Sequence, residues 1–206
     1  LIGAIVCAIP LYLSGHFATY LDATFEALSG LTTSGLSVIQ DLDHLDRSMN
    51  LYRHLTHFAG GQGIVVVVLT LFAAGGGRIG TLYVSEARDE RITPNVIRTA
   101  RFIYLIAAAY LVVGTIALTI AINLAGIQFD RAIWHAVNVF MAAFDTGGFA
   151  PYSTSIAYYH SSLVEWVLLV LMFAGTLSFG HHFQLWRGDR WELLRNLETR
   201  TLATTA

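Results

Sequence analysis

Two short polar segments that end in glycine hold the residues whose types and spacing could do chemistry. They are Leu31-Thr32-Thr33-Ser34-Gly35 and Phe144-Asp145-Thr146-Gly147-Gly148-Phe149, and long apolar stretches flank both. A desolvated monovalent cation needs several oxygen ligands, and backbone carbonyl groups can supply them where small side chains leave the path open. Glycine takes positive φ at little steric cost, so successive carbonyls can turn the same way. These residue types predict carbonyl-lined ion binding at Thr32, Thr33, Ser34, Gly35, Thr146, Gly147 and Gly148.

A short amphipathic run precedes each glycine segment and must position it. The runs are Asp22–Leu31 and about Asp130–Ala143, and both are too short to cross a bilayer. Irregular backbone at membrane depth is tolerated only inside protein or beside a water-filled cavity, so such a segment implies a pore or a binding cavity. Each short helix would point its partially negative C-terminal end inward, where a cation is stabilised. We interpret Asp22 and Glu26 as helix-start acids at the interface.

The composition is that of a membrane protein. Hydrophobic residues make up 55% of the 206 residues and charged residues 13%, and the mean hydropathy is +0.58. The chain has 12 arginines, no lysine and a net charge of -2, which is not the signature of a nucleic-acid-binding protein. The single cysteine, Cys7, excludes a disulfide framework and a cysteine-based metal site.

Apolar runs of crossing length predict the transmembrane helices. Three are Leu55–Ala74, Phe102–Ala125 and Leu163–Leu185, and we interpret the shorter run Leu1–Gly15 as a truncated crossing rather than a secretory signal peptide. Nine arginines lie in the loop after the second crossing and in the C-terminal tail, so these parts are predicted to be cytoplasmic. Both glycine segments then lie on the outer side.

The order of crossing, short helix, glycine turn and crossing occurs twice, at a period of roughly a hundred residues, which indicates a duplicated unit. The predicted fold is an all-α integral membrane protein with tandem repeats of helix, re-entrant pore helix with filter loop, and helix, as in potassium-channel-like pores. The predicted parts are a first repeat at 1–74, a cytoplasmic loop at 75–101, a second repeat at 102–186 and a cytoplasmic tail or linker at 187–206.

Ordered motifs along nearly the whole chain resemble the Trk/Ktr/HKT superfamily of potassium transporters, and specifically its Trk-type translocating subunit. The stretch from Asp22 to Ser37 is similar to the first pore segment of that family. The motifs that follow in the same order are Arg53-His54, Gly60-Gly61-Gln62-Gly63-Ile64, Phe144 to Phe149, Ile156-Ala157-Tyr158-Tyr159 and Gly180-His181-His182-Phe183.

The resemblance implies a potassium uptake protein, not an enzyme, in which four repeats surround one ion path. It assigns the filter to Thr32, Thr33, Ser34 and Gly35 and to Asp145, Thr146, Gly147 and Gly148. This chain holds two repeats, so the others belong to a longer chain or to a second copy, and the missing start methionine favours the longer chain. Selectivity for potassium over sodium, and channel-like flow against ion-coupled symport, are left open.

The resemblance also implies the surroundings of the protein. The implied location is the bacterial inner membrane, with the lipid bilayer as a partner. Full subunits of the family pair as homodimers, and a cytosolic nucleotide-binding ring docks on the inner face. Potassium is the transported ion, no organic cofactor is expected, and nucleic acid is not a partner.

Two features depart from the family pattern. Asp145 stands where the family more often has an amide or a small residue, so its carboxylate either raises cation occupancy at the mouth or bonds behind the filter. His135 lies 13 residues before Gly148, whereas Glu26 lies nine before Gly35. Either the second short helix is about one turn longer, or the alignment of the two repeats slips.

A membrane redox subunit is the alternative hypothesis. Imidazole groups on facing helices can hold haem or a metal, and His57 and His181 are the candidates. The run from Gly75 to Gly80 matches a dinucleotide-binding GxGxxG pattern, but it follows a membrane helix rather than a strand, so we interpret it as a helix ending.

Overall fold

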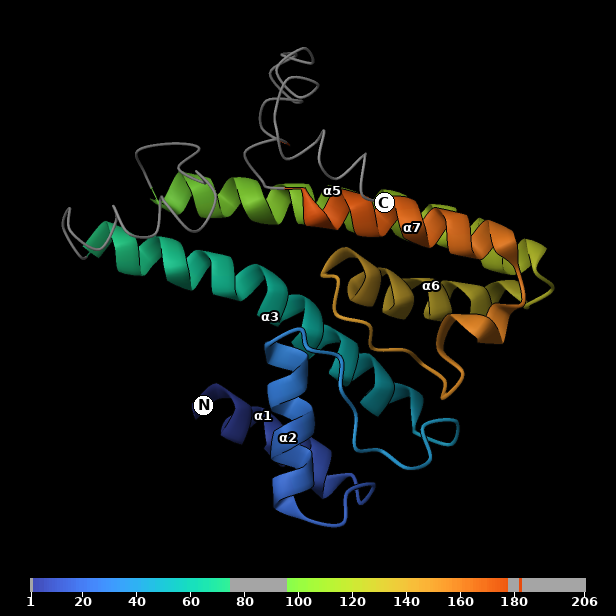
Figure 1. Cartoon of the computed structure of the whole chain (residues 1–206), viewed down its shortest axis with the longest axis horizontal. Coiled ribbons are helices and arrows are strands. Elements are labelled where there is room, and N and C mark those ends of the chain that lie inside the picture. The colour runs from blue at the N-terminus through green and yellow to red at the C-terminus, as the bar shows by residue number, and fades with distance from the viewer. Residues whose placement is uncertain (1, 75–95, 178–181, 183–206) are drawn as a thin grey trace. The chain divides into compact units, whose positions relative to one another are not determined.

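The structure is a computed structural model that describes residues 2–74, 96–177 and 182, with side chains described for 2–63, 100–177 and 182. Over these residues the chain is helical and contains no strand (Figure 1). The all-α prediction is therefore confirmed for this part of the chain. The elements are α1 (Ile2–Leu13), α2 (Tyr20–Leu31), α3 (Arg47–Ala74), α5 (Val96–Leu124), α6 (Phe129–Phe144), the 3-10 helix η1 (Ser155–Tyr159) and α7 (Ser162–Thr176).

The helices begin and end close to the predicted bounds, with three exceptions. Helix α7 ends at Thr176, nine residues before the predicted end at Leu185. Helix α3 begins at Arg47, before the apolar run predicted from Leu55, because its first turns carry polar side chains that are buried. Helix α5 begins at Val96, inside the predicted loop 75–101. The rest of that loop, the tail 187–206 and the residues Gly75 to Gly80 and His181 lie outside the described residues.

Of the four predicted crossings, one meets a length and composition test within the described residues. It is Ala100–Leu124, with a mean hydropathy of 2.4. Ile2–Leu13 and Ser162–Thr176 are apolar but shorter. The outward face of α5 is apolar, with relative exposures of 59% at Val112, 66% at Val113, 56% at Ile116, 56% at Ile120 and 71% at Leu124. Such a face suits hydrocarbon better than water.

The chain divides into two compact units. The first is Leu1–Ile64 with Ala107–Thr176, and it contains both glycine segments. Within it, α1 packs against α2 and α6 packs against α7 (Figure 1). The second unit is Val65–Ile106 with Leu177–Ala206, and its described residues include the C-terminal part of α3 and the N-terminal part of α5.

Each helix pair of the first unit buries its own apolar cluster. Ala8 and Leu11 of α1 meet Ala23 and Ala27 of α2, and these four side chains are at most 1% exposed. Small side chains on both helices allow their backbones to lie close together. The larger cluster includes Phe140 of α6, together with residues of α5 and α7.

The two short helices begin differently. Thr19 caps α2: its hydroxyl oxygen accepts a hydrogen bond from the Asp22 backbone N–H at 3.2 Å, and the Asp22 carboxylate accepts one from the Thr19 N–H at 3.0 Å. Gln128 precedes α6 and makes no side-chain capping bond. The reciprocal arrangement at Thr19 is a capping box, which satisfies two otherwise free backbone donors.

We expect Thr19→Ala to lower the free energy of unfolding by about 1 kcal/mol, because one capping bond is lost. Gln128→Ala is the matched control and should change stability by less than about 0.5 kcal/mol. Thermal unfolding of the detergent-solubilised protein measures both. Equal losses in the two variants would contradict the capping assignment.

Candidate functional site

The two glycine segments have the same backbone conformation. We call residues 32–35 the first glycine loop and residues 145–148 the second glycine loop. Thr33 and Thr146 both have φ of 54°, and Gly35 and Gly148 have φ of 69° and 89°. A threonine at positive φ is uncommon, so its occurrence at corresponding positions of two loops points to one shared structure.

Each loop also closes the end of its helix in the same way. The last carbonyls of α2 and α6 accept hydrogen bonds from loop backbone N–H groups, as at other helix ends that turn through a left-handed residue. Each of these backbone bonds in the first loop has a counterpart in the second at the same sequence offset. The bonds join Thr33 to Gly30 (3.0 Å), Ser34 to Ser29 (3.1 Å), Thr146 to Ala143 (3.1 Å) and Gly147 to Ala142 (3.0 Å).

This register accounts for the spacing difference between the two predicted repeats. Helix α6 has 16 residues and α2 has 12, so α6 is longer by about one turn. The loops themselves align without a slip. The first of the two alternatives, a longer second helix, is therefore the one that the structure shows.

The two loops touch each other. A Cβ atom built on Gly35 would overlap the carbonyl oxygen of Gly147, so the two backbones lie in direct contact. The structure thus brings the predicted site residues of both segments together. Thr32, Ser34, Thr146 and Gly148 are exposed, and Thr33, Gly35, Asp145 and Gly147 are partly buried.

Helix α3 packs against the end of α2, where the first loop begins, and against the second loop. A Cβ atom on Gly60 would overlap the backbone of Leu31, and a Cβ atom on Gly61 would lie 2.6 Å from the Asp145 carboxyl carbon. Because these two residues lack side chains, the end of α2 and the Asp145 side chain can pack directly against α3. The close contacts of Gly60 and Gly61 are thus made to the end of α2 and to the second glycine loop.

Asp145 faces α3. Its Oδ1 atom accepts a hydrogen bond from Gln62 Nε2 at 2.9 Å. Its Oδ2 atom is buried and has no hydrogen-bond partner among the described residues. Of the two predicted alternatives for Asp145, the geometry is that of a carboxyl group bonded behind the loop.

A buried ion pair that sequence reasoning missed lies beside the first loop. Glu26 of α2 and Arg53 of α3 are each 1% exposed, and the Arg53 Nε and Nη2 atoms lie 2.7 and 2.6 Å from Glu26 Oε1. The interpretation of Glu26 as an interfacial helix-start acid is therefore wrong. A carboxylate beyond the first turn of a short helix that packs inside a membrane protein could have indicated that Glu26 is paired, although not with which residue.

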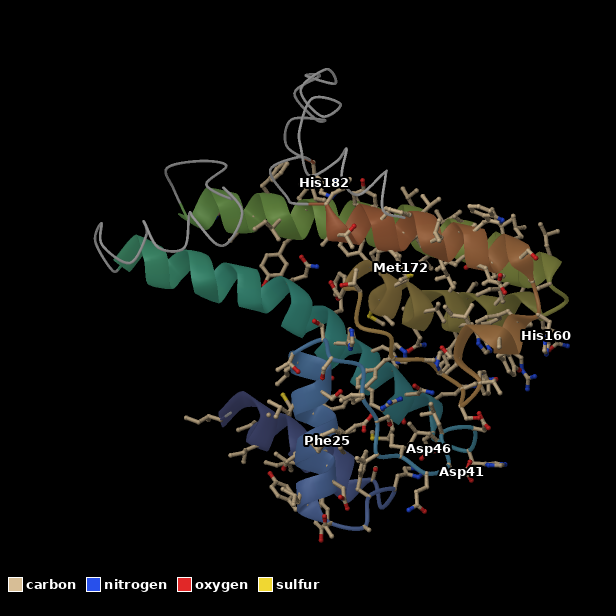
Figure 2. All side chains as sticks on the ribbon, in the orientation of Figure 1. Phe25, Asp41, Asp46, His160, Met172 and His182 are labelled. Atoms are coloured by element: carbon tan, nitrogen blue, oxygen red, sulfur yellow. The ribbon has the colours of Figure 1, made fainter. Side chains whose placement is uncertain are left out.

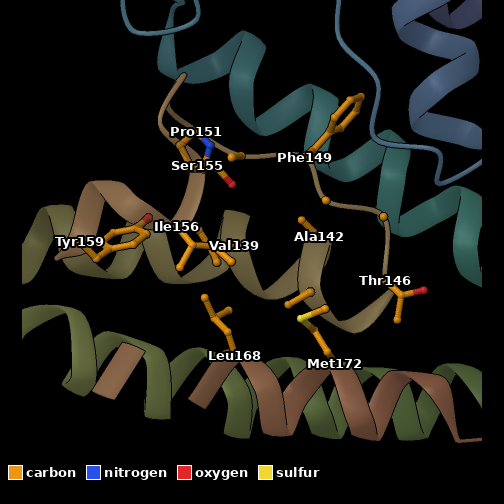
Figure 3. Close-up of a pocket in the computed structure, with 14 residues that line it drawn as sticks. Val139, Ala142, Thr146, Phe149, Pro151, Ser155, Ile156, Tyr159, Leu168 and Met172 are labelled. Atoms are coloured by element: carbon orange, nitrogen blue, oxygen red, sulfur yellow. The ribbon is translucent and has the colours of Figure 1, made fainter. Parts of the chain in front are cut away.

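An apolar cavity of about 160 Å³ lies on the other side of the second loop. Val139 and Ala142 of α6 face Leu168 and Met172 of α7 across it (Figure 3). Figure 3 also shows the Phe149 ring pointing away from the cavity, toward α3. Phe149 packs there on His57, with ring centroids 4.9 Å apart.

An exposed contact joins the segment that precedes α3 to the segment between the second glycine loop and η1. Ser153 donates hydrogen bonds from its hydroxyl group and its backbone N–H to the two carboxylate oxygens of Asp43, at 2.6 and 2.9 Å. These bonds hold the pKa of Asp43 below its usual value. Asp41 and Asp46, which lie near Asp43 in the sequence, are exposed (Figure 2), and a hydrogen bond to Asp41 raises the pKa of His44.

Comparison with known proteins identifies the family. The family model described as TrkH, cation transport protein, matches residues 4–199. The chain belongs to the TrkH family. A Trk system potassium uptake protein TrkG of Escherichia coli is 34% identical over 96% of this chain and 40% of that protein, and an uncharacterized cation transporter of Methanocaldococcus jannaschii is 34% identical over 91% and 38%.

The fold agrees with a solved structure of the TrkH family. The crystal structure of the potassium transporter TrkH from Vibrio parahaemolyticus matches with a TM-score of 0.73 and 26% identity, over 98% of this chain and 40% of that one. The chain thus spans about 40% of the length of the relatives it matches. The TrkH family consists of membrane transporters rather than enzymes, as predicted, and the redox hypothesis finds no support among these relatives.

We expect Gly147→Ala to destabilise the protein by about 1–3 kcal/mol, because a Cβ atom there would overlap the His57 ring. Gly63→Ala on α3 is the matched control, since a Cβ atom on Gly63 meets nothing within 4 Å. Thermal unfolding in detergent measures the difference. If the clash is the cause, adding His57→Ala to Gly147→Ala should cost less than the sum of the two single changes.

Proposed function

We propose that this chain provides two quarters of a potassium translocation path. In this proposal the carbonyl oxygens of the first and second glycine loops replace water around the ion, at Thr32, Thr33, Ser34 and Gly35 and at Asp145, Thr146, Gly147 and Gly148. The observation that carries the proposal is the shared backbone of the two loops, with positive φ at Thr33, Thr146, Gly35 and Gly148. The TrkG and TrkH relatives are potassium uptake proteins, which supports potassium as the ion.

The helices that end at the loops support a cation rather than an anion. Both loops follow the C-terminal ends of α2 and α6, where the helix dipole places a partial negative charge. The Thr33 and Thr146 side chains are small enough to leave the backbone oxygens accessible. A carbonyl-lined path also agrees with the absence of a charged side chain from the exposed positions of the two loops.

The rest of the assembly follows from the same proposal. Residues 1–74 and 102–186 form two helix, pore helix and helix repeats, and two further repeats, of the same chain or a second copy, complete a ring of four. The loops face the outside of a bacterial inner membrane, and residues 75–101 and 187–206 are cytoplasmic. Homodimers of full subunits and a cytosolic nucleotide-binding ring are the proposed partners, and ion-coupled symport is the proposed mode of uptake.

We expect Gly35→Ala and Gly148→Ala each to abolish potassium uptake while the protein still inserts in the membrane. A side chain at positive φ costs roughly 1–2 kcal/mol, and a Cβ atom at Gly35 would also displace the Gly147 carbonyl group. Uptake by cells that lack other potassium transporters, normalised to the amount of protein in the membrane, measures the effect.

Gly126→Ala is the matched control, because Gly126 also has positive φ, of 97°, but lies outside both loops with nothing within 4 Å of a Cβ atom. Its uptake should stay close to that of the unchanged protein. Normal potassium uptake by both Gly35→Ala and Gly148→Ala would contradict the proposed function.

A further inference from the structure

The chain segments that leave the two glycine loops meet at one side chain, Arg53. We propose that Arg53 is a positioning residue for ion selectivity, which holds the two loops in fixed relation to each other. This inference rests on the proposed function of the loops as parts of one ion path.

Arg53 reaches the first loop through Glu26. The Glu26 carboxylate accepts hydrogen bonds from the Ser37 hydroxyl group at 3.0 and 3.1 Å and from the Val38 backbone N–H at 3.1 Å. Arg53 Nη2 also donates to the Ser37 hydroxyl oxygen at 3.3 Å. Ser37 and Val38 follow Gly35 closely in sequence, so this pair anchors the exit of the first loop to α2 and α3.

Arg53 reaches the second loop through Phe149 and Asn50. Its guanidinium carbon lies 4.4 Å from the centroid of the Phe149 ring, and Phe149 directly follows Gly148. Arg53 Nη1 donates to Asn50 Oδ1 at 3.2 Å, and Asn50 Nδ2 donates to the Pro151 carbonyl oxygen at 2.9 Å. The exit of the second loop is therefore anchored to the same guanidinium group.

The chemistry of this site requires arginine. A planar guanidinium group can donate several hydrogen bonds in its plane and stack on an aromatic ring at the same time, whereas an ammonium group is a single point charge. Arg53, Glu26 and Asn50 are each 1% exposed, so water does not replace a lost contact. Ion discrimination by carbonyl groups depends on where their oxygens lie, and loosening one exit shifts those oxygens.

The test compares potassium and sodium uptake by the whole protein that carries this chain, reconstituted in liposomes. The variants are Arg53→Lys, which keeps the charge, and Phe149→Leu, which keeps an apolar side chain but removes the ring. Arg47→Lys is the matched control, because Arg47 is exposed on the same helix, with its guanidinium carbon 5.7 Å from the Trp134 ring centroid. Initial rates against ion concentration give the potassium-to-sodium selectivity ratio for protein of equal folded amount.

We expect Arg53→Lys to lower the selectivity ratio about tenfold, as the loss of one or two charge-assisted hydrogen bonds would, with potassium uptake still measurable. Phe149→Leu should lower it less, and Arg47→Lys should leave it unchanged. An unchanged ratio in Arg53→Lys and Phe149→Leu overturns the inference, even if their unfolding temperatures fall. If Arg53→Lys does not fold, an unchanged ratio in Phe149→Leu alone overturns it. A lack of potassium uptake by the unchanged protein instead overturns the proposed function.

Discussion

Contact between backbones at glycine is the constraint on which the arrangement of the two loops depends. The Gly147 carbonyl oxygen occupies the space that a Cβ atom of Gly35 would need, and the Leu31 backbone does the same at Gly60. Small residues allow such approach between segments that lack a regular hydrogen-bond ladder. Since α2, α3 and α6 all end at or pass these points, a side chain at any one of them would move more than one element.

A second constraint is that buried charged side chains must find their partners within the protein instead of in water. Taking two charges out of water costs several kcal/mol per ion, and their attraction offsets this only when further hydrogen bonds satisfy both groups. Ser37, Val38 and Asn50 supply these further hydrogen bonds to Glu26 and Arg53. The same bonds give the irregular segments after the loops a fixed place against α3. The same hydrogen bonds thus stabilise the buried charges and order the segments that follow the loops.

The sequence predicted the elements better than the contacts between them. Apolar runs and glycine turns located α2, α6 and both loops, because these signals are local. The partners of Glu26 and Asp145 were not predictable, since Arg53 and Gln62 come from a helix distant in sequence and their pairing depends on how α3 packs. The early start of α3 escaped prediction for the same reason: its first turns are polar, and only burial by neighbouring segments explains them.

The two loops have the same backbone conformation, but different side chains hold them in place. The first is anchored through Glu26 and Ser37, while the second has Asp145 bonded to Gln62 and Gly147 packed on His57. In an assembly of identical subunits, a substitution changes every equivalent position at once. Here both loops belong to one chain, so a change at Asp145 alters one of them and leaves the other intact. The presence of both loops in one chain therefore allows each loop to acquire its own chemistry.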